Sequence, residues 1–191
     1  MKKLLLSAAV LVIGFSVIAQ TKWAVDPVHS SLNFSVRHLG ISEVIGRFMK
    51  FDGSYTAAKK DFSDIKISFN VDAASVNTGA EKRDEDLRSD NFFNTALYPS
   101  LKFESISMKK IKGNNYRLTG KLTIRDVTKV VTIEVIYGGL TKDPWGNMRT
   151  GFSGMAIINR FDYDIKYDAT GLAVGKIITL NLNLEFVEAK M

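Results

Sequence analysis

The chain has 191 residues, with 26 lysines and arginines, 20 aspartates and glutamates, and no cysteine. The lack of cysteine excludes disulfides, thiolate nucleophiles and cysteine-ligated metals. The net charge of +6 is a mild excess, and the basic residues are scattered, so the composition favours an ordinary solvated surface over a face that binds nucleic acid.

The first nineteen residues have the pattern of an export signal. Lys2 and Lys3 precede an apolar stretch from Leu4 to Val17, and Val17, Ile18 and Ala19 are small or tolerable residues before a cleavage after Ala19. The apolar stretch is short for a bilayer span of about 20 residues, and no basic cluster follows it, which makes a membrane anchor the weaker interpretation. We therefore predict a signal peptide over residues 1–19, a single domain over residues 20–191, and a periplasmic or secreted location.

Alternation of apolar and polar side chains dominates the rest of the chain. The pattern appears at residues 31–37, 65–71, 116–124, 131–137 and 178–186. A period of two is typical of strands with one buried and one solvated face. Turns rich in glycine and asparagine imply antiparallel neighbours, and about eight such strands hide their edges most economically by closing into a barrel. A β-sandwich is the alternative, because alternation does not distinguish one closed sheet from two facing ones.

The segment between residues 74 and 99 interrupts this alternation. Its charged run "RDEDLR" suits a helix, Asn77 and Thr78 are candidate N-caps, and Pro99 is a candidate stop. We expect a short helical insertion around residues 77–97 that covers one end or flank of the barrel. Its charged face is expected to lie in solvent.

Residue types with catalytic or metal-binding chemistry are sparse. The two histidines, His29 and His38, have no third metal ligand nearby in the sequence. Structural hydrogen bonding is the favoured role for both, for His38 near a strand end and for His29 with Asp26 and Ser30, and a polar role of His38 at a cavity is the alternative. The sequence has no Gly-x-Ser-x-Gly motif and no phosphate-binding loop, and the carboxylates of residues 84–86 suit a solvated helix face better than an acid/base pair. We predict no catalytic residue, no metal site and no cofactor.

The side chains that strand parity places inside the barrel are large and apolar, and the chain contains twelve phenylalanines. A barrel of eight strands can be filled by such side chains or can hold one small ligand. Burial of an apolar ligand contributes roughly 0.8 kcal/mol per methylene group. The residues alone leave both possibilities open.

Four segments of the chain stand out in order and spacing: "WAVDPVHSSLNFSVRHLGISEVIGRFMKFDGSY", "SVNTGAEKRDEDLRSDNFFNTALYPSLKFES", "GKLTIRDVTKVVTIEV" and "INRFDYDI". They resemble the YceI-like family of bacterial periplasmic proteins, and the resemblance as a whole spans about Trp23 to Phe186. The resemblance implies a lipocalin-like barrel whose elongated cavity holds a polyisoprenoid, an isoprenoid quinone or a similar long-chain amphiphile. It also implies transport or storage rather than catalysis. The chain departs from the family at Asp126 and Asp164, where glycine is usual, although aspartate tolerates turn conformations well.

Strand parity and the resemblance together give a set of predicted ligand-binding side chains. The expected lining residues are Leu32, Phe34, Val36, Phe69, Phe103, Leu118, Leu122 and Ile124. Phe48, Phe92 and Phe93 are expected to act as gates, and His38 is the expected polar contact for a head group.

The expected partner is a long-chain isoprenoid or fatty amphiphile, with no nucleic acid, and a transient membrane contact or a homodimer is compatible with the sequence. Two other functions stay open. One is a filled barrel that serves as a stress-response or interaction module without cargo. The other is a hydrolase or isomerase that uses His38 with a nearby carboxylate.

Overall fold

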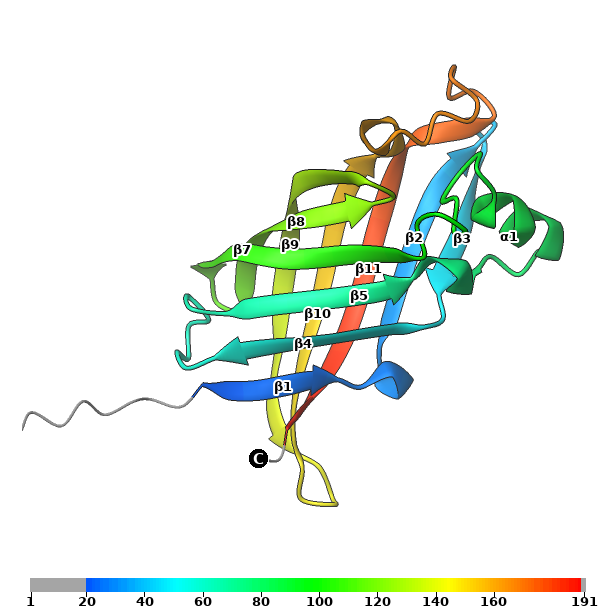
Figure 1. Ribbon diagram of the computed structural model, residues 1–191. Helices are drawn as coiled ribbons and strands as arrows, with labels where there is room; N and C mark the ends of the chain where they lie inside the picture. The colour runs from blue at the N-terminus through cyan, green and yellow to red at the C-terminus, as the bar shows by residue number, and fades with distance from the viewer. Residues whose placement is uncertain (1–19, 190–191) are drawn as a thin grey trace, which may run out of the picture.

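The computed structural model describes residues 20–189, so the signal peptide predicted over residues 1–19 lies outside the described residues. Figure 1 shows the arrangement of the elements. The strands are β1 (Thr21–Val25), β2 (Ser31–His38), β3 (Ser42–Phe48), β4 (Phe51–Ala57), β5 (Lys66–Asp72), β6 (Val76–Asn77), β7 (Ser100–Lys112), β8 (Asn115–Ile124), β9 (Val127–Lys142), β10 (Met148–Asn159) and β11 (Val174–Glu188). The helix α1 (Glu81–Arg88) is accompanied by three short 3-10 helices, η1 (Pro27–His29), η2 (Ala73–Ser75) and η3 (Arg160–Tyr163). Within residues 20–189, none of the helices has the length and apolar character needed to cross a membrane.

Eight of the strands close into a ring. The order is β1-β4-β5-β7-β8-β9-β10-β11, and β1 closes it because Trp23 lies opposite Tyr55 of β4 on one side and opposite Glu188 of β11 on the other. All of these pairings are antiparallel. The predicted eight-stranded antiparallel barrel is confirmed, and the alternative of two facing sheets is wrong because the hydrogen-bonded ladder is continuous around the ring.

The strand β11 has three neighbours and carries an extension of the barrel. Its last residues pair with β1, whereas residues 174–183 pair with β2, so β1 and β2 are successive pieces of one wall, interrupted by η1. The strands β2 and β3 form a hairpin, and β6 pairs with the end of β3. Figure 1 shows this ribbon leaning away from β5 and β7, with α1 on the same side.

The insertion lies where it was predicted, but its capping differs from the prediction. The helix α1 begins after Ala80, which makes no side-chain cap, and it ends at Arg88, well before Pro99. Thr78 instead donates its backbone N–H and its hydroxyl to Asp84 Oδ1, at 2.8 and 2.6 Å. Asp84 is therefore buried, with 3% exposure, rather than solvated as expected. A carboxylate inside the helix that accepts from the preceding loop replaces a side-chain cap.

The charged run also fastens the insertion to the barrel. The guanidinium of Arg88 donates from Nε to the carbonyl oxygen of Ala74 at 2.9 Å and from Nη2 to that of Val76 at 3.2 Å. Both acceptors belong to the η2–β6 segment, which pairs with β3. The charges therefore hold the helix in place, and the phenylalanines that follow can pack against the wall.

Asp126 and Asp164, the two aspartates that the sequence comparison of motifs singled out, behave differently. Asp164 has a φ of 56°, in the left-handed region, directly after η3. In the turn between β8 and β9 the left-handed residue is Arg125, with a φ of 57°, and not its neighbour Asp126. Arg125 donates to the carbonyl oxygen of Asp164 at 3.0 Å, which joins the two turns. Asp164 accordingly occupies a conformation that aspartate tolerates better than most residues.

Candidate ligand-binding cavity

The interior of the barrel contains a cavity of about 160 Å³. Side chains from β2, β3 and all ring strands except β1 line it, together with Ile65 just before β5, and nearly all of them are aliphatic or aromatic. Asn33, Lys102 and Ser153 also border the cavity, but strand parity points their side chains to the outer face, which leaves their backbone on the inside. The interior therefore offers a hydrocarbon and aromatic surface to whatever enters it.

Seven of the predicted ligand-binding residues line this cavity. They are Leu32, Phe48, Phe69, Phe103, Leu118, Leu122 and Ile124. These side chains lie close together because alternation along each strand turns them to the inward face of the sheet. Their contact with a ligand stays a prediction.

Three predicted residues of β2 lie away from the cavity lining. The ring of Phe34 covers Gly46 on the neighbouring strand and packs against Phe48, with 5.8 Å between ring centroids. Val36 and His38 lie further along β2, where it pairs with β3 and with β11 rather than within the ring. His38 is exposed at the strand end. A head group held inside the cavity would therefore not meet His38.

The two predicted gate residues after α1 lie behind the cavity wall. Phe93 packs edge-on against Phe48 at 5.6 Å, and Phe48 itself lines the cavity. Phe92 is buried against Tyr167 at 5.0 Å, in a cluster that includes Tyr163. Movement of the segment after α1 would thus reach the cavity through Phe48, and the gating role stays a prediction.

A cluster of aromatic side chains that was not among the predicted site residues also borders the cavity. Tyr55, Phe152 and Phe186 line the cavity, and the rings of Tyr55 and Phe186 meet edge-on at 4.9 Å. Phe62 contributes from the loop between β4 and β5, where it packs edge-on against Phe152 at 5.5 Å and Tyr137 at 5.0 Å. Phe186 could have been found from its alternation. Phe62 carries no periodic signal, because it lies in a turn with a φ of 58°.

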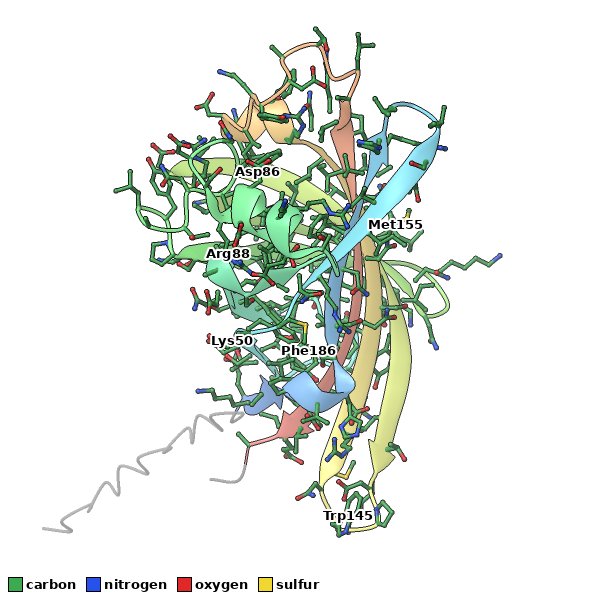
Figure 2. All side chains as sticks on the ribbon, turned by 90° about the vertical axis from the view of Figure 1, so that its right-hand side faces the viewer. Lys50, Asp86, Arg88, Trp145, Met155 and Phe186 are labelled. Atoms are coloured by element: carbon green, nitrogen blue, oxygen red, sulfur yellow. The ribbon has the colours of Figure 1, made fainter. Side chains whose placement is uncertain are left out.

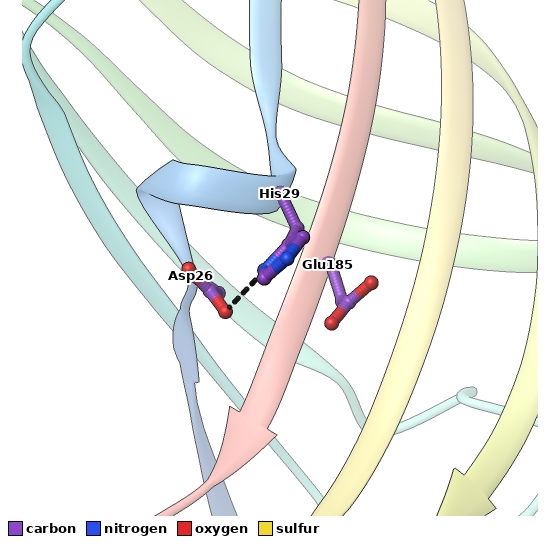
Figure 3. A group of neighbouring side chains, drawn as sticks. All are labelled: Asp26, His29 and Glu185. Carbon is purple, nitrogen blue, oxygen red and sulfur yellow. Dashed lines mark hydrogen bonds and ion pairs between the residues drawn. The ribbon is translucent and has the colours of Figure 1, made fainter. Parts of the chain in front are cut away.

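Near the break between β1 and β2, Arg149 forms ion pairs with three carboxylates. It donates to Asp143 from Nε at 2.7 Å, to Asp26 from Nη1 at 2.8 Å, and to Glu185. His29 Nδ1 lies 2.9 Å from Asp26 Oδ2, as the sequence predicted for this pair (Figure 3). Sequence reasoning missed the rest because Arg149 is 123 residues away from Asp26.

The electrostatics of this cluster favour a structural role. The hydrogen bond from Arg149, followed by that from His29, lowers the pKa of Asp26 to about 2. The same guanidinium holds the pKa of Asp143 well below its usual range. Asp26, His29 and Glu185 bring three potential metal ligands within 4.8 Å of one another. Because Arg149 already binds both carboxylates, the arrangement is an ion cluster organised around a guanidinium.

A sequence model described as a YceI-like domain matches residues 23–186. The chain belongs to the YceI-like family. The family resemblance found in the motifs is thereby confirmed. Among YceI-like relatives, protein YceI of Escherichia coli O17:K52:H18 (strain UMN026 / ExPEC) is 40% identical over 155 residues, which cover 81% of each chain.

Two solved structures show the same fold at low sequence identity. Burkholderia cenocepacia BcnA superimposes with a TM-score of 0.77 at 21% identity, covering 84% of this YceI-like chain and 98% of BcnA. A polyisoprenoid binding domain from Saccharophagus degradans, implicated in plant cell wall breakdown, gives a TM-score of 0.68 at 17% identity and covers 87% and 98% of the two chains. At these identities the likeness shows the shared lipocalin-like barrel.

Proposed function

We propose that this YceI-like protein binds a long-chain isoprenoid, such as a polyisoprenoid or an isoprenoid quinone, noncovalently inside the barrel for transport or storage. The observation that carries the proposal is the cavity of about 160 Å³ with its almost wholly apolar lining. Membership of the YceI-like family and the fold shared with a polyisoprenoid binding domain support it. As part of the same proposal, the activity is located in the periplasm or outside the cell, which the export pattern of residues 1–19 supports.

The chemistry of the lining favours an uncharged hydrocarbon chain. Each methylene group that moves from water into this interior contributes roughly 0.8 kcal/mol, whereas a buried charge without a partner is strongly unfavourable. The side chains that strand parity turns into the cavity carry no charge among the described residues. A charged head group would therefore remain near an opening, while the chain lies between the aromatic cluster of Tyr55, Phe152 and Phe186 and the wall at Phe48.

The cavity also favours a binder over the two other functions left open by the sequence. A filled barrel without cargo would not need an apolar space enclosed by inward side chains. Catalysis by His38 is poorly supported, because this side chain is exposed at the end of β2 and outside the cavity lining. We therefore propose a carrier that performs no reaction on its ligand.

A bulky substitution inside the cavity tests the proposal. Leu182 lines the cavity, and Leu182→Trp should fill part of it and weaken the binding of a polyprenol and of an isoprenoid quinone by about tenfold or more. Asn181→Trp is the matched control, because Asn181 is the preceding residue, exposed on the outer face of the same strand. Binding is measured by tryptophan quenching or by titration calorimetry, with circular dichroism to check the fold. Equal ligand affinity in the two variants would contradict the proposal.

A further inference from the structure

The hairpin between β9 and β10 ends in the most exposed aromatic side chain of the described residues. Trp145 is 79% exposed, whereas the other tryptophan, Trp23, is 9% exposed and stacks on Tyr55. Figure 2 shows Trp145 at the extreme end of the molecule, on a hairpin that extends beyond the rest of the barrel. Leu140, on the same hairpin, is 54% exposed. Exposed tryptophan is unfavourable in water and usually marks a surface that contacts something else.

The tip is held rigidly by hydrogen bonds. Asp143 Oδ1 accepts from the backbone N–H groups of Trp145, at 3.0 Å, and Asn147, at 2.8 Å. Asp143 Oδ2 accepts from Arg149, which also binds Asp26 and Glu185 of the barrel wall. The turn is therefore fixed to the barrel by the ion cluster, and Trp145 is held outward without further loss of backbone entropy on contact.

At the tip of the hairpin, residues 140–149, the exposed charge has one sign. Of the three charged residues in this range, Asp143 and Arg149 belong to the ion cluster, with side chains that are only 6% and 17% exposed. Lys142 remains exposed, and its chain runs beside the turn at Gly146. A convex tip with a tryptophan, a leucine and a free lysine suits the interface of an anionic bilayer, where tryptophan lies at head-group depth and lysine meets phosphate.

We propose that the β9–β10 hairpin is a lipid-surface anchor, in which Trp145 enters the head-group region of a membrane and Lys142 favours anionic lipids. The anchor goes beyond cargo binding and does not depend on the cavity being loaded. Contact through a single hairpin is expected to be weak and reversible, as suits a protein that touches a membrane transiently.

The test uses the purified protein with vesicles of phosphatidylcholine alone or of equimolar phosphatidylcholine and phosphatidylglycerol, prepared without isoprenoids. Because Trp23 is buried, a change of tryptophan emission reports on Trp145. We expect vesicles to shift the tryptophan emission to shorter wavelength and to reduce its quenching by acrylamide. In flotation, Trp145→Ala should lower the partition coefficient by about tenfold, and Lys142→Gln should lower it by about fivefold on the anionic vesicles only.

The control variant is Ile41→Ala, which removes an exposed aliphatic side chain (83% exposed) from the β2–β3 turn, at the other end of the molecule from Trp145. It should leave vesicle binding unchanged. The proposal is overturned if neither vesicle alters the emission of Trp145, or if Ile41→Ala abolishes flotation and Trp145→Ala does not. Capture of a protein partner through Trp145 without any vesicle binding would likewise overturn it. Because the vesicles contain no isoprenoid, an absence of vesicle binding would not affect the ligand-binding test with Leu182→Trp.

Discussion

At the residue scale, glycines decide where the phenylalanine rings of the wall can lie. A methyl group on Gly46 would stand 2.2 Å from Cζ of Phe34, and one on Gly120 would stand 2.2 Å from Cζ of Phe103. Each ring thus occupies the space that a side chain on the adjacent strand would need. Phe103 covers Gly120 and still lines the cavity, whereas Phe34 covers Gly46 outside the lining, on the part of β2 that pairs with β3.

Gly46→Ala should therefore destabilise the barrel. The added methyl group forces Phe34 or the strand to move, and overpacking of this kind typically costs about 1–3 kcal/mol. Gly151→Ala is the control, because Gly151 is also in a strand but its nearest neighbour lies 4.0 Å from the added carbon. Urea denaturation of both variants provides the measurement. Similar midpoints for the two variants would show that the contact with Phe34 does not constrain the wall.

Lining residues that lie in regularly alternating strands could be predicted from the sequence. Leu118, Leu122 and Ile124 follow strict alternation on one strand, so their inward position was predictable from period two. The position of Phe62 depends on a turn with positive φ, and the Arg149 cluster depends on contacts between residues far apart in the chain. Local patterns carry no information on either.

At the element scale, the Arg149 cluster joins the end of β1, the β9–β10 hairpin and β11. The pKa of Asp26 is lowered to about 2 in the folded protein from an ordinary 3.8. A carboxyl with a lowered folded-state pKa contributes stability that is present above its unfolded pKa and is lost as the pH falls toward the folded value. The cluster should accordingly stabilise the protein at neutral pH and lose this effect in acid.

Arg149→Met should lower the melting temperature at neutral pH and flatten its dependence on pH between about pH 5 and the folded pKa of Asp26. The physical reason is that the carboxyl groups of Asp26 and Asp143 lose the hydrogen bonds that depress their pKa. Thermal melts by circular dichroism across this range measure the slope. If the variant and the unaltered protein lose stability in parallel on acidification, the cluster is not the source of the acid sensitivity.

Elements with regular alternation were predicted more reliably than those with irregular spacing. The strands β5 and β8 lie within one residue of their predicted ranges at both ends. The strand β10 contains Gly151 and Gly154 and the adjacent pair Ile157 and Ile158, which obscure a period of two. The strand β7 has irregularities in its pairing with β8 between Ser105 and Ser107, so its parity changes along its length.

At the scale of the whole molecule, the sequence predicted a closed barrel but not the branching of its wall. Closure followed from the number of strands and the need to hide their edges. The three neighbours of β11 could not be predicted, because they require η1 to interrupt one wall so that β1 and β2 pair with different parts of the same strand. The β2–β3 ribbon, which carries His38 away from the cavity lining, is a consequence of that branching.

The central claim, that the barrel carries an apolar ligand, is tested most directly by native mass spectrometry of the protein purified from an exported fraction, followed by solvent extraction. We predict a stoichiometric apolar mass that is present under native conditions and is released on denaturation. A bare polypeptide mass that persists after incubation with isoprenoid quinones and polyprenols would contradict the account.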